Sequence, residues 1–285
     1  MHKKLIFILF TLCQFVLFGQ AKMTKIAELD DDLEETSGLV LYQDNYFISH
    51  NDGGNKAELF ILDLSGKLIK KIKITNADND DWEDIAQDNK GNLYIGDFGN
   101  NDNKRKKCQI YILKKGFIKK GEVEVDKISF SYEDQKDYPP KKKDLNFDCE
   151  AMIWKDDHII LFTKSRAKPY KGRTNIYRLK AEPGKQEAKR IGNMNLCQMG
   201  WRFCSITAAD YDKKTNTLVL LTYSKIYAFT DFEENDFWNG NIQSYTLEKP
   251  RQREAICFGG KNEFFITDEK KKGFGGGNLY KIDIK

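Results

Sequence analysis

Three glutamate residues occur at matching places in a pattern that recurs along the chain: Glu83, Glu150 and Glu254. If the fold brings these places together, the carboxylates converge, and like charges a few ångström apart require a cation, hydrogen-bond donors or protonation. Ca²⁺ and Mg²⁺ prefer carboxylate and amide oxygens as ligands. We therefore predict that Glu83, Glu150 and Glu254 are metal ligands, with Ca²⁺ as the candidate ion and no other cofactor.

A second group of polar residues lies close to these places, most of them at the end of the strand that follows. The residues predicted to bind a ligand are Asn51, Asp97, Lys164, Asp210 and Asp268. His50 ends one of these strands and is the candidate general base, because an imidazole can accept a proton near neutral pH. The alternative for His50 is a hydrogen-bonded residue at a strand end.

A structural role is the alternative for the acidic residues as well. In that interpretation they accept hydrogen bonds from backbone N–H groups at the crowded centre of the fold. They could also form ion pairs with Lys164 and neighbouring arginines, which neutralise a buried carboxylate without a metal. The residue types alone leave both interpretations open.

The pattern that carries these residues is a repeat of a short motif, a turn and a strand that ends in polar residues. Its five copies begin at Thr36–Leu39, Trp82–Ile85, Cys149–Met152, Thr207–Asp210 and Arg253–Ile256. Copies about 45 to 70 residues apart, with three or four short strands in each, are typical of β-propeller blades. We expect Ser37 and Ala208 at the two matching positions that lack a glutamate.

The fold class predicted from this repeat is all-β, a single β-propeller with five blades. Six blades are the alternative if residues 115–147 contain a divergent blade. The N-terminal segment Lys22–Leu29 is a lone strand candidate, whereas the last blade ends at Lys285 after three obvious strands. We therefore expect the N-terminal strand to complete the C-terminal blade, which removes open strand edges.

Residues 1–19 are predicted to form a cleaved signal peptide. Lys3 and Lys4 precede an apolar run that ends at Phe18, and the small residue Gly19 follows, as in secretory signals. The run is shorter than a membrane-spanning helix requires, so no transmembrane segment is expected after cleavage. The propeller domain is then residues 20–285, in an exported protein of the periplasm or the extracellular space.

The cysteines allow one disulfide bond in an exported chain. Cys197 and Cys204 are the plausible pair, because they close a short loop around Gly200 and Trp201. The alternative is that all five cysteines beyond the signal peptide are buried small apolar side chains, and we favour it. After cleavage two of the three histidines remain, so a multi-histidine metal centre is excluded.

Charge and composition exclude some partners. The 47 Lys and Arg residues nearly balance the 43 Asp and Glu residues, and the two signs are interspersed, so nucleic acid is not an expected partner. The 13% aromatic content indicates a folded chain rather than a disordered one. We expect a monomer whose partner is a small molecule or an envelope protein.

Several segments resemble a group of secreted bacterial β-propellers. They span nearly the whole mature chain and are Glu35–Leu39, Asn51–Gly54, Asp81–Ala86, Gly91–Asn101, Glu150–Ala151 and Ile206–Asp210. More distantly, the chain resembles phytase-like, gluconolactonase-like and NHL-type propellers. The gluconolactonase-like resemblance implies a central divalent metal held by Glu, Asn and Asp, with which Glu83, Glu150 and Glu254 are compatible. The phytase-like resemblance implies phosphate ester substrates and several Ca²⁺ ions.

Two functions follow from these observations. The first is a binding module, an exported propeller that uses its channel face to bind a ligand or an envelope partner, with Ca²⁺ as a candidate stabilising ion. The alternative is a metal-dependent hydrolase, lactonase-like or phosphoesterase-like, in which a central carboxylate site and a base such as His50 act on the substrate. The sequence leaves open whether the protein is an enzyme.

Overall fold

Short β-strands make up most of the computed structural model, which describes residues 17–197, 199–271, 273 and 275–284. The all-β prediction is confirmed. The helical elements are α1 (Trp201–Cys204), η1 (Asp31–Leu33), η2 (Phe117–Lys119), η3 (Lys142–Asp144) and η4 (Phe237–Asn239). No helix among the described residues is long and apolar enough to cross a membrane. The predicted signal peptide lies mostly outside the described residues.

The strands form five antiparallel sets of four, which follow the predicted repeat. The first set is β2 (Thr36–Tyr42), β3 (Tyr46–Asn51), β4 (Glu58–Leu62) and β5 (Leu68–Ile74). The second is β6 (Trp82–Gln87), β7 (Leu93–Asp97), β8 (Cys108–Leu113) and β10 (Asp126–Tyr132). The third is β11 (Asp148–Lys155), β12 (His158–Lys164), β13 (Arg173–Lys180) and β14 (Gly184–Asn195).

The last two sets include the N-terminal strand. The fourth is β15 (Ile206–Asp212), β16 (Thr217–Thr222), β17 (Lys225–Thr230) and β18 (Asn241–Thr246). The fifth is β19 (Arg253–Gly260), β20 (Glu263–Asp268), β21 (Asn278–Ile284) and β1 (Leu17–Glu28). The expected strand from the N-terminus therefore pairs with the C-terminal repeat, antiparallel to β21.

Residues 115–147, which were considered for a sixth repeat, contribute to the sets above. They contain β9 (Glu122–Val123), which pairs in parallel with β5 at the edge of the first set. They also contain β10, the outer strand of the second set. Parallel pairing of β10 with β14 and of β1 with β18 joins neighbouring sets at their outer edges.

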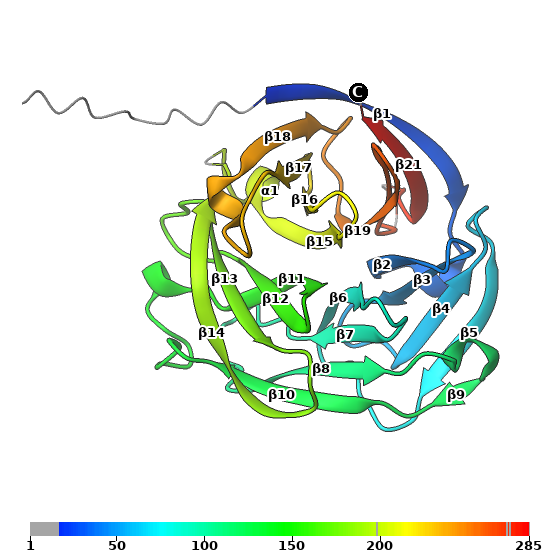
Figure 1. The fold of residues 1–285 in the computed structure, drawn as a ribbon, viewed down its shortest axis with the longest axis horizontal. Helices are drawn as coiled ribbons and strands as arrows, with labels where there is room; N and C mark the ends of the chain where they lie inside the picture. Colours follow the sequence, from blue (N-terminus) through cyan, green and yellow to red (C-terminus); the bar gives the residue numbers. More distant parts are fainter. Residues whose placement is uncertain (1–16, 198, 272, 274, 285) are drawn as a thin grey trace, which may run out of the picture.

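The first strands of the five sets face a common centre (Figure 1). Around that centre β2 contacts β6, β6 contacts β11, β11 contacts β15, β15 contacts β19, and β19 contacts β2. One apolar cluster fills the space between each neighbouring pair of sets in the described chain. The first and fifth sets, for example, share the cluster that contains Leu39, Phe47 and Cys257, which connects the end of the ring to its beginning.

Cys197 and Cys204 form a disulfide bond. The interpretation that we favoured, in which all five cysteines are unpaired apolar side chains, is therefore wrong for these two. It is right for Cys108, Cys149 and Cys257, which are buried and unpaired. Tertiary structure decides which cysteines pair. The loop between β14 and α1 brings Cys197 to a Cα separation of 5.3 Å from Cys204, the last residue of α1.

Candidate functional site

Each innermost strand contains a β-bulge, and the bulges carry the three predicted glutamates. The residue left without a partner on the second strand is Gly38, Glu83, Glu150, Thr207 or Glu254 in the five sets. Our alignment of the repeat is therefore wrong by one residue at Ser37 and Ala208, whose neighbours Gly38 and Thr207 occupy the bulge. A bulge redirects its side chain away from the regular sheet pattern.

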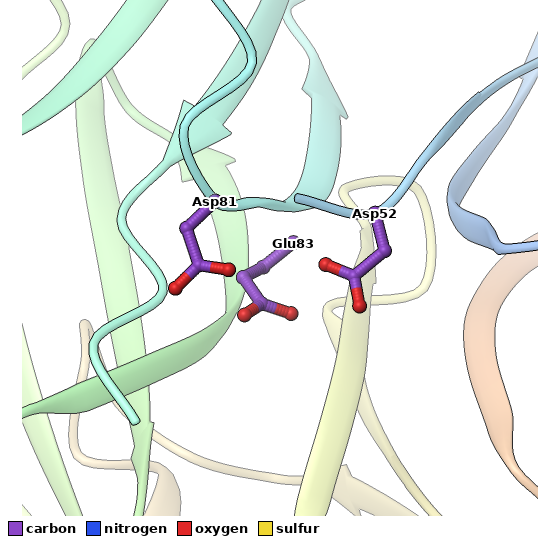
Figure 2. Close-up of side chains that lie close together, drawn as sticks. All are labelled: Asp52, Asp81 and Glu83. Atoms are coloured by element: carbon purple, nitrogen blue, oxygen red, sulfur yellow. The ribbon is translucent and has the colours of Figure 1, made fainter. Parts of the chain in front are cut away.

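Three carboxylates converge at this end of the ring (Figure 2). Asp52 lies in the turn after β3, Asp81 immediately precedes β6, and Glu83 is the bulge residue of β6. One oxygen of each lies within 4.8 Å of the others. At such separations each pair of full charges repels by about 3–4 kcal/mol at an effective dielectric of roughly 20. The cluster therefore requires protonation or a cation.

Glu83 is the member of this cluster that lacks compensation. Its side chain is buried, with 6% of the residue exposed. Among the described residues, no donor forms a hydrogen bond or ion pair with its carboxylate. Burial raises the pKa of Glu83 well above the ordinary value, and repulsion from Glu150, Asp52 and Asp81 raises it further. Burial raises the pKa of Asp81 to about 6, and repulsion from Asp52 and Asp148 acts in the same direction, although the charge of Arg105 opposes it.

Two glycines leave the space that these carboxylates occupy. A Cβ atom on Gly53 would lie 2.5 Å from Asp81 Oδ1, and one on Gly99 would lie 2.2 Å from Glu83 Oε1. Both distances are far below van der Waals contact. Gly53 and Gly99 are therefore needed for close packing against the carboxylates.

Asn79 holds together the two loops that supply Asp52 and Asp81. Its Nδ2 donates to the carbonyl oxygens of Asn51 (3.1 Å) and Asp52 (2.9 Å). Its Oδ1 accepts from the backbone N–H of Trp82 (3.0 Å). Because Asn79 is buried, these three bonds fix the relative position of the loops.

A second acidic group consists of Glu83, Asp148 and Glu150, and cations neutralise two of its members, Asp148 and Glu150. Lys164 Nζ donates to Glu150 Oε2 (2.8 Å), and Arg166 Nε donates to Asp148 Oδ2 (2.5 Å). Arg166 also contacts Glu150 Oε1 at 3.3 Å. The predicted alternative, ion pairing with Lys164 and a nearby arginine, is thus confirmed for Glu150. Because Lys164 and Arg166 already supply positive charge here, a metal ion is less necessary for this group than for Asp52, Asp81 and Glu83.

Glu254, the third predicted ligand, belongs to neither group. It is buried, and burial together with repulsion from Asp52 raises its pKa to about 7, although the charge of Lys164 acts in the opposite direction. Glu254 therefore lies within electrostatic range of the cluster of Asp52, Asp81 and Glu83.

A cavity of about 910 Å³ lies beside these acids. Its walls are Trp201, Arg202, Phe203, Tyr223, Lys249, Pro250, Arg251, Gln252, Glu269, Lys271 and Gly275. Tyr223 connects the cavity to the acids, because its hydroxyl accepts a hydrogen bond of 3.4 Å from Lys164. Burial and repulsion from Glu254 and Asp52 raise the pKa of Glu269 to about 8.

A larger cavity, of about 1360 Å³, lies at the other end of the fourth and fifth sets. Its lining includes Asp212 at the end of β15 and Gly260 at the end of β19. Predicted site residues line neither cavity, but Tyr223 on the wall of the smaller one contacts the predicted residue Lys164. We therefore place the candidate site at the smaller cavity.

Asp97 and Asp268, two predicted ligand-binding residues, occupy matching places and make matching contacts. Asp97 Oδ2 accepts a hydrogen bond from Tyr111 (3.2 Å), and Asp268 Oδ2 accepts one from Tyr280 (3.1 Å). In each case the tyrosine belongs to the third strand of the same set. Arg105 also forms an ion pair with Asp97 at 2.9 Å. Both carboxylates thus connect strands within one set.

Two further acidic side chains accept hydrogen bonds from backbone N–H groups at the centre of the ring. Asp84 Oδ2 accepts from the N–H of Met152 (2.9 Å) and of Ala209 (3.3 Å), and so connects three sets. Asp210 Oδ2 accepts from the N–H of Phe258 (2.8 Å). Asp84 and Asp210 therefore make the contacts of the structural alternative, in which the acids accept hydrogen bonds from backbone N–H groups at the centre of the fold.

His50, the candidate base, is fully buried. Its Nδ1 lies 3.0 Å from the carbonyl oxygen of Asn51, and because a carbonyl only accepts, the proton is on Nδ1. Burial lowers the pKa of His50 to about 4, so the ring is neutral at pH 7. Asn51, predicted to bind a ligand, donates from Nδ2 to the carbonyl of Asp32 (2.8 Å), and its buried Oδ1 lacks a partner.

Sequence reasoning missed several residues of the site as ligands or positioning residues: Asp52, Asn79, Asp81, Asp148 and Glu269. Most of them lie in loops or beside the repeat motif, where the periodic pattern ends. Gly53 and Gly99 are the signal from which the proximity of Asp81 and Glu83 could have been predicted, since glycine beside a group of acids indicates close packing.

Comparison with known proteins identifies the fold class. No protein-family model and no curated sequence matches this chain. The structure is similar to the PQQ-bound aldose sugar dehydrogenase of Streptomyces coelicolor, with TM-score 0.53, 10% identity, and 93% of this chain and 99% of that chain covered. It is also similar to a protein provisionally assigned as a gluconolactonase, with TM-score 0.50, 10% identity, and coverage of 94% and 92%. These proteins are β-propellers, and likeness at such identity shows the fold alone.

Proposed function

We propose that this protein is an exported, monomeric, five-bladed β-propeller, closed by β1, that holds a divalent cation and hydrolyses a small molecule. The cation ligands are Asp52, Asp81 and Glu83, and the substrate occupies the cavity of about 910 Å³. The five sets of four strands and the pairing of β1 with β21 support the blade count and the closure. The disulfide bond is compatible with export.

Glu83 is the observation that carries the proposal. A buried carboxylate that lacks a donor and lies beside two other carboxylates is an unfavourable arrangement unless it is protonated or a cation is present, and a cation relieves the repulsion among all three. Its oxygen-only ligand set suits a hard cation such as Ca²⁺ or Mg²⁺. When bound, such a cation supplies Lewis-acid polarisation of a substrate oxygen and lowers the pKa of a bound water.

Glu269 supplies the proton-transfer chemistry of the proposed hydrolase. It lies on the cavity wall, and a pKa of about 8 keeps its carboxyl group largely protonated at neutral pH. A protonated carboxylic acid can donate its proton to a leaving group. Ion pairing keeps Lys164 and Arg166 next to Glu150, so these cations hold the ring acids in place.

The test measures the cation first and turnover second. Isothermal titration with Ca²⁺ and Mg²⁺, and metal analysis of the purified protein, should reveal one tightly bound divalent ion. Glu83→Gln should weaken binding at least about tenfold, because it removes one charged ligand. The matched control is Glu122→Gln on β9, an exposed acid. Absence of divalent-ion binding by the folded wild-type protein would refute the cation site.

Turnover is then assayed with lactones and phosphate esters as two substrate classes. We expect hydrolysis that requires the cation and decreases at least about tenfold in Glu269→Gln, because that variant cannot act as an acid. If the protein binds the cation and a ligand but hydrolyses neither class, the result would instead support a binding module, which is the second candidate function.

The second candidate is a binding module for a small molecule or an envelope partner. The observation that favours it is His50, whose buried and neutral ring lies away from solvent. The described part of the site therefore lacks a histidine base. In this case the cation, with Ca²⁺ as the candidate, stabilises the ring and orients the ligand.

A further inference from the structure

Cationic side chains without acidic partners surround the cavity beside the carboxylates. Arg202, Lys249 and Lys271 line it and are exposed. None of the three forms an ion pair within 4 Å in the part of the chain that the structure describes. Arg251, a fourth cation on the wall, reaches Asp268 only at 3.8 Å. The rim of the cavity is therefore positive, although its inner end adjoins acids.

Two residues of the same wall each have a polar side-chain atom that lacks a hydrogen-bond partner. Trp201 Nε1, a donor, and Gln252 Oε1, an acceptor, are both shielded from solvent and unpaired. A buried polar atom without a partner costs about 1–3 kcal/mol, and such atoms in folded proteins call for an explanation. One donor and one acceptor on one cavity wall match the hydroxyl groups of a ligand, which both donate and accept.

Aromatic residues form another part of the wall. Trp201, Phe203 and Tyr223 line the cavity, and the Trp201 and Tyr223 rings lie 6.1 Å apart. Lys164 Nζ lies 5.5 Å from the centre of each ring. Such contacts hold both rings against a fixed cation. The wall therefore offers a rigid apolar surface against which a compact ring can pack.

We propose that this cavity binds an anionic, hydroxylated small molecule, of the kind represented by a sugar phosphate or a sugar acid. Arg202, Lys249 and Lys271 attract the anionic group, whereas Gln252 Oε1 and Trp201 Nε1 bind hydroxyl groups. The ring of the ligand packs on Trp201 and Phe203. The inference deepens the proposed function, on whose site it rests, because it names the chemical class of the ligand: a sugar phosphate is a hydrolysable substrate, and a sugar acid is the product of lactone hydrolysis.

The experiment is isothermal titration of the purified protein with glucose 6-phosphate, gluconate and glucose, in EDTA and again with Ca²⁺. In EDTA we expect both anions to bind at least about tenfold more tightly than glucose, with an affinity that decreases as salt increases. Lys249→Ala/Lys271→Ala should weaken binding of the anions at least about tenfold and leave binding of glucose unchanged. Lys213→Ala/Lys261→Ala, away from this cavity, is the matched control and should bind like the wild type.

Glucose 6-phosphate and gluconate distinguish a phosphate from a carboxylate as the source of negative charge. Tighter binding of either anion than of glucose supports the proposal. Equal binding of glucose and the anions, no binding of any of the three, or wild-type affinity in the Lys249→Ala/Lys271→Ala variant would overturn it. The cation site is tested separately. Anion binding in EDTA by a protein that binds neither Ca²⁺ nor Mg²⁺ would refute the proposed cation site and leave the anion site standing.

Discussion

At the scale of single residues, Gly99 shows how closely the carboxylate cluster is packed. A Cβ atom on Gly99 would lie 2.2 Å from Glu83 Oε1 and 2.4 Å from the carboxyl carbon of Asp81. We predict that Gly99→Ala displaces both side chains and weakens Ca²⁺ binding at least about tenfold while the fold is retained. Titration calorimetry and circular dichroism measure the two effects.

The control for this prediction is Gly121→Ala. A Cβ atom there has no neighbour within 4 Å, so Ca²⁺ affinity should remain at the wild-type value. Equal affinity of Gly99→Ala and wild-type protein would show that Glu83 and Asp81 do not hold the ion in the observed arrangement.

At the scale of elements, the disulfide bond restrains the segment that carries one wall of the cavity. It connects Cys197 to Cys204 at the end of α1, a helix of four residues that is too short to be stable alone. For so short a loop, the chain-entropy model gives up to about 2.5 kcal/mol of stabilisation. We predict that Cys197→Ser/Cys204→Ser lowers the free energy of unfolding by roughly 1–2.5 kcal/mol and weakens binding of glucose 6-phosphate.

Urea denaturation with and without dithiothreitol measures the effect on stability. Dithiothreitol should destabilise the wild type and leave the double variant unchanged, because Cys108, Cys149 and Cys257 are unpaired. A double variant as stable as the wild type would mean that packing alone holds this loop.

At the scale of the whole molecule, the ring depends on its N-terminal strand. Residues 21–28 of β1 pair with β21, and Met23 and Ile26 pack against neighbouring apolar clusters. We predict that a chain beginning at Asp30 has a Tm at least about 5 °C below that of a chain beginning at Gln20 and forms oligomers, because β21 becomes an open edge. Thermal denaturation and size-exclusion chromatography with light scattering measure this. A monomer of unchanged Tm would contradict closure by β1.

The acids of the site also make the stability of the whole protein depend on pH. The pKa values are raised in the folded state, to about 6 for Asp81, about 7 for Glu254 and about 8 for Glu269. The folded protein therefore binds more protons than the unfolded chain above pH 4, so stability decreases as pH rises from about 4 to 8. We predict that in EDTA the Tm is lower at pH 8 than at pH 5.5.

Calcium should reverse much of this effect. At pH 8, Ca²⁺ at about a hundred times its Kd should raise the Tm by roughly 5–10 °C. At pH 5 the increase should be much smaller, because protons compete for the same carboxylates. Differential scanning calorimetry measures both values, and a Tm in EDTA that rises from pH 5.5 to 8 would contradict the pKa shifts.

The repeat and its strands could be predicted from the sequence because each depends on local pattern. Alternating apolar residues between Gly, Asn and Asp turns specify short strands, and a recurring motif specifies recurring units. The glutamates of three repeats were identified for the same reason. Ser37 and Ala208 were each placed one residue from the bulge, because a bulge is defined by the pairing of two strands and leaves little mark on one of them.

The composition of the candidate site was decided by tertiary structure. Asp52 and Asp81 come from different loops that Asn79 joins, and Lys164 compensates Glu150 rather than Glu83. Which carboxylate keeps an uncompensated charge depends on distances between segments far apart in the sequence, because electrostatic interactions and desolvation depend on position in space. The sequence by itself determined the repeated strands and three ring glutamates, whereas tertiary structure selected Glu83 as the member of the cluster that is buried without a compensating charge.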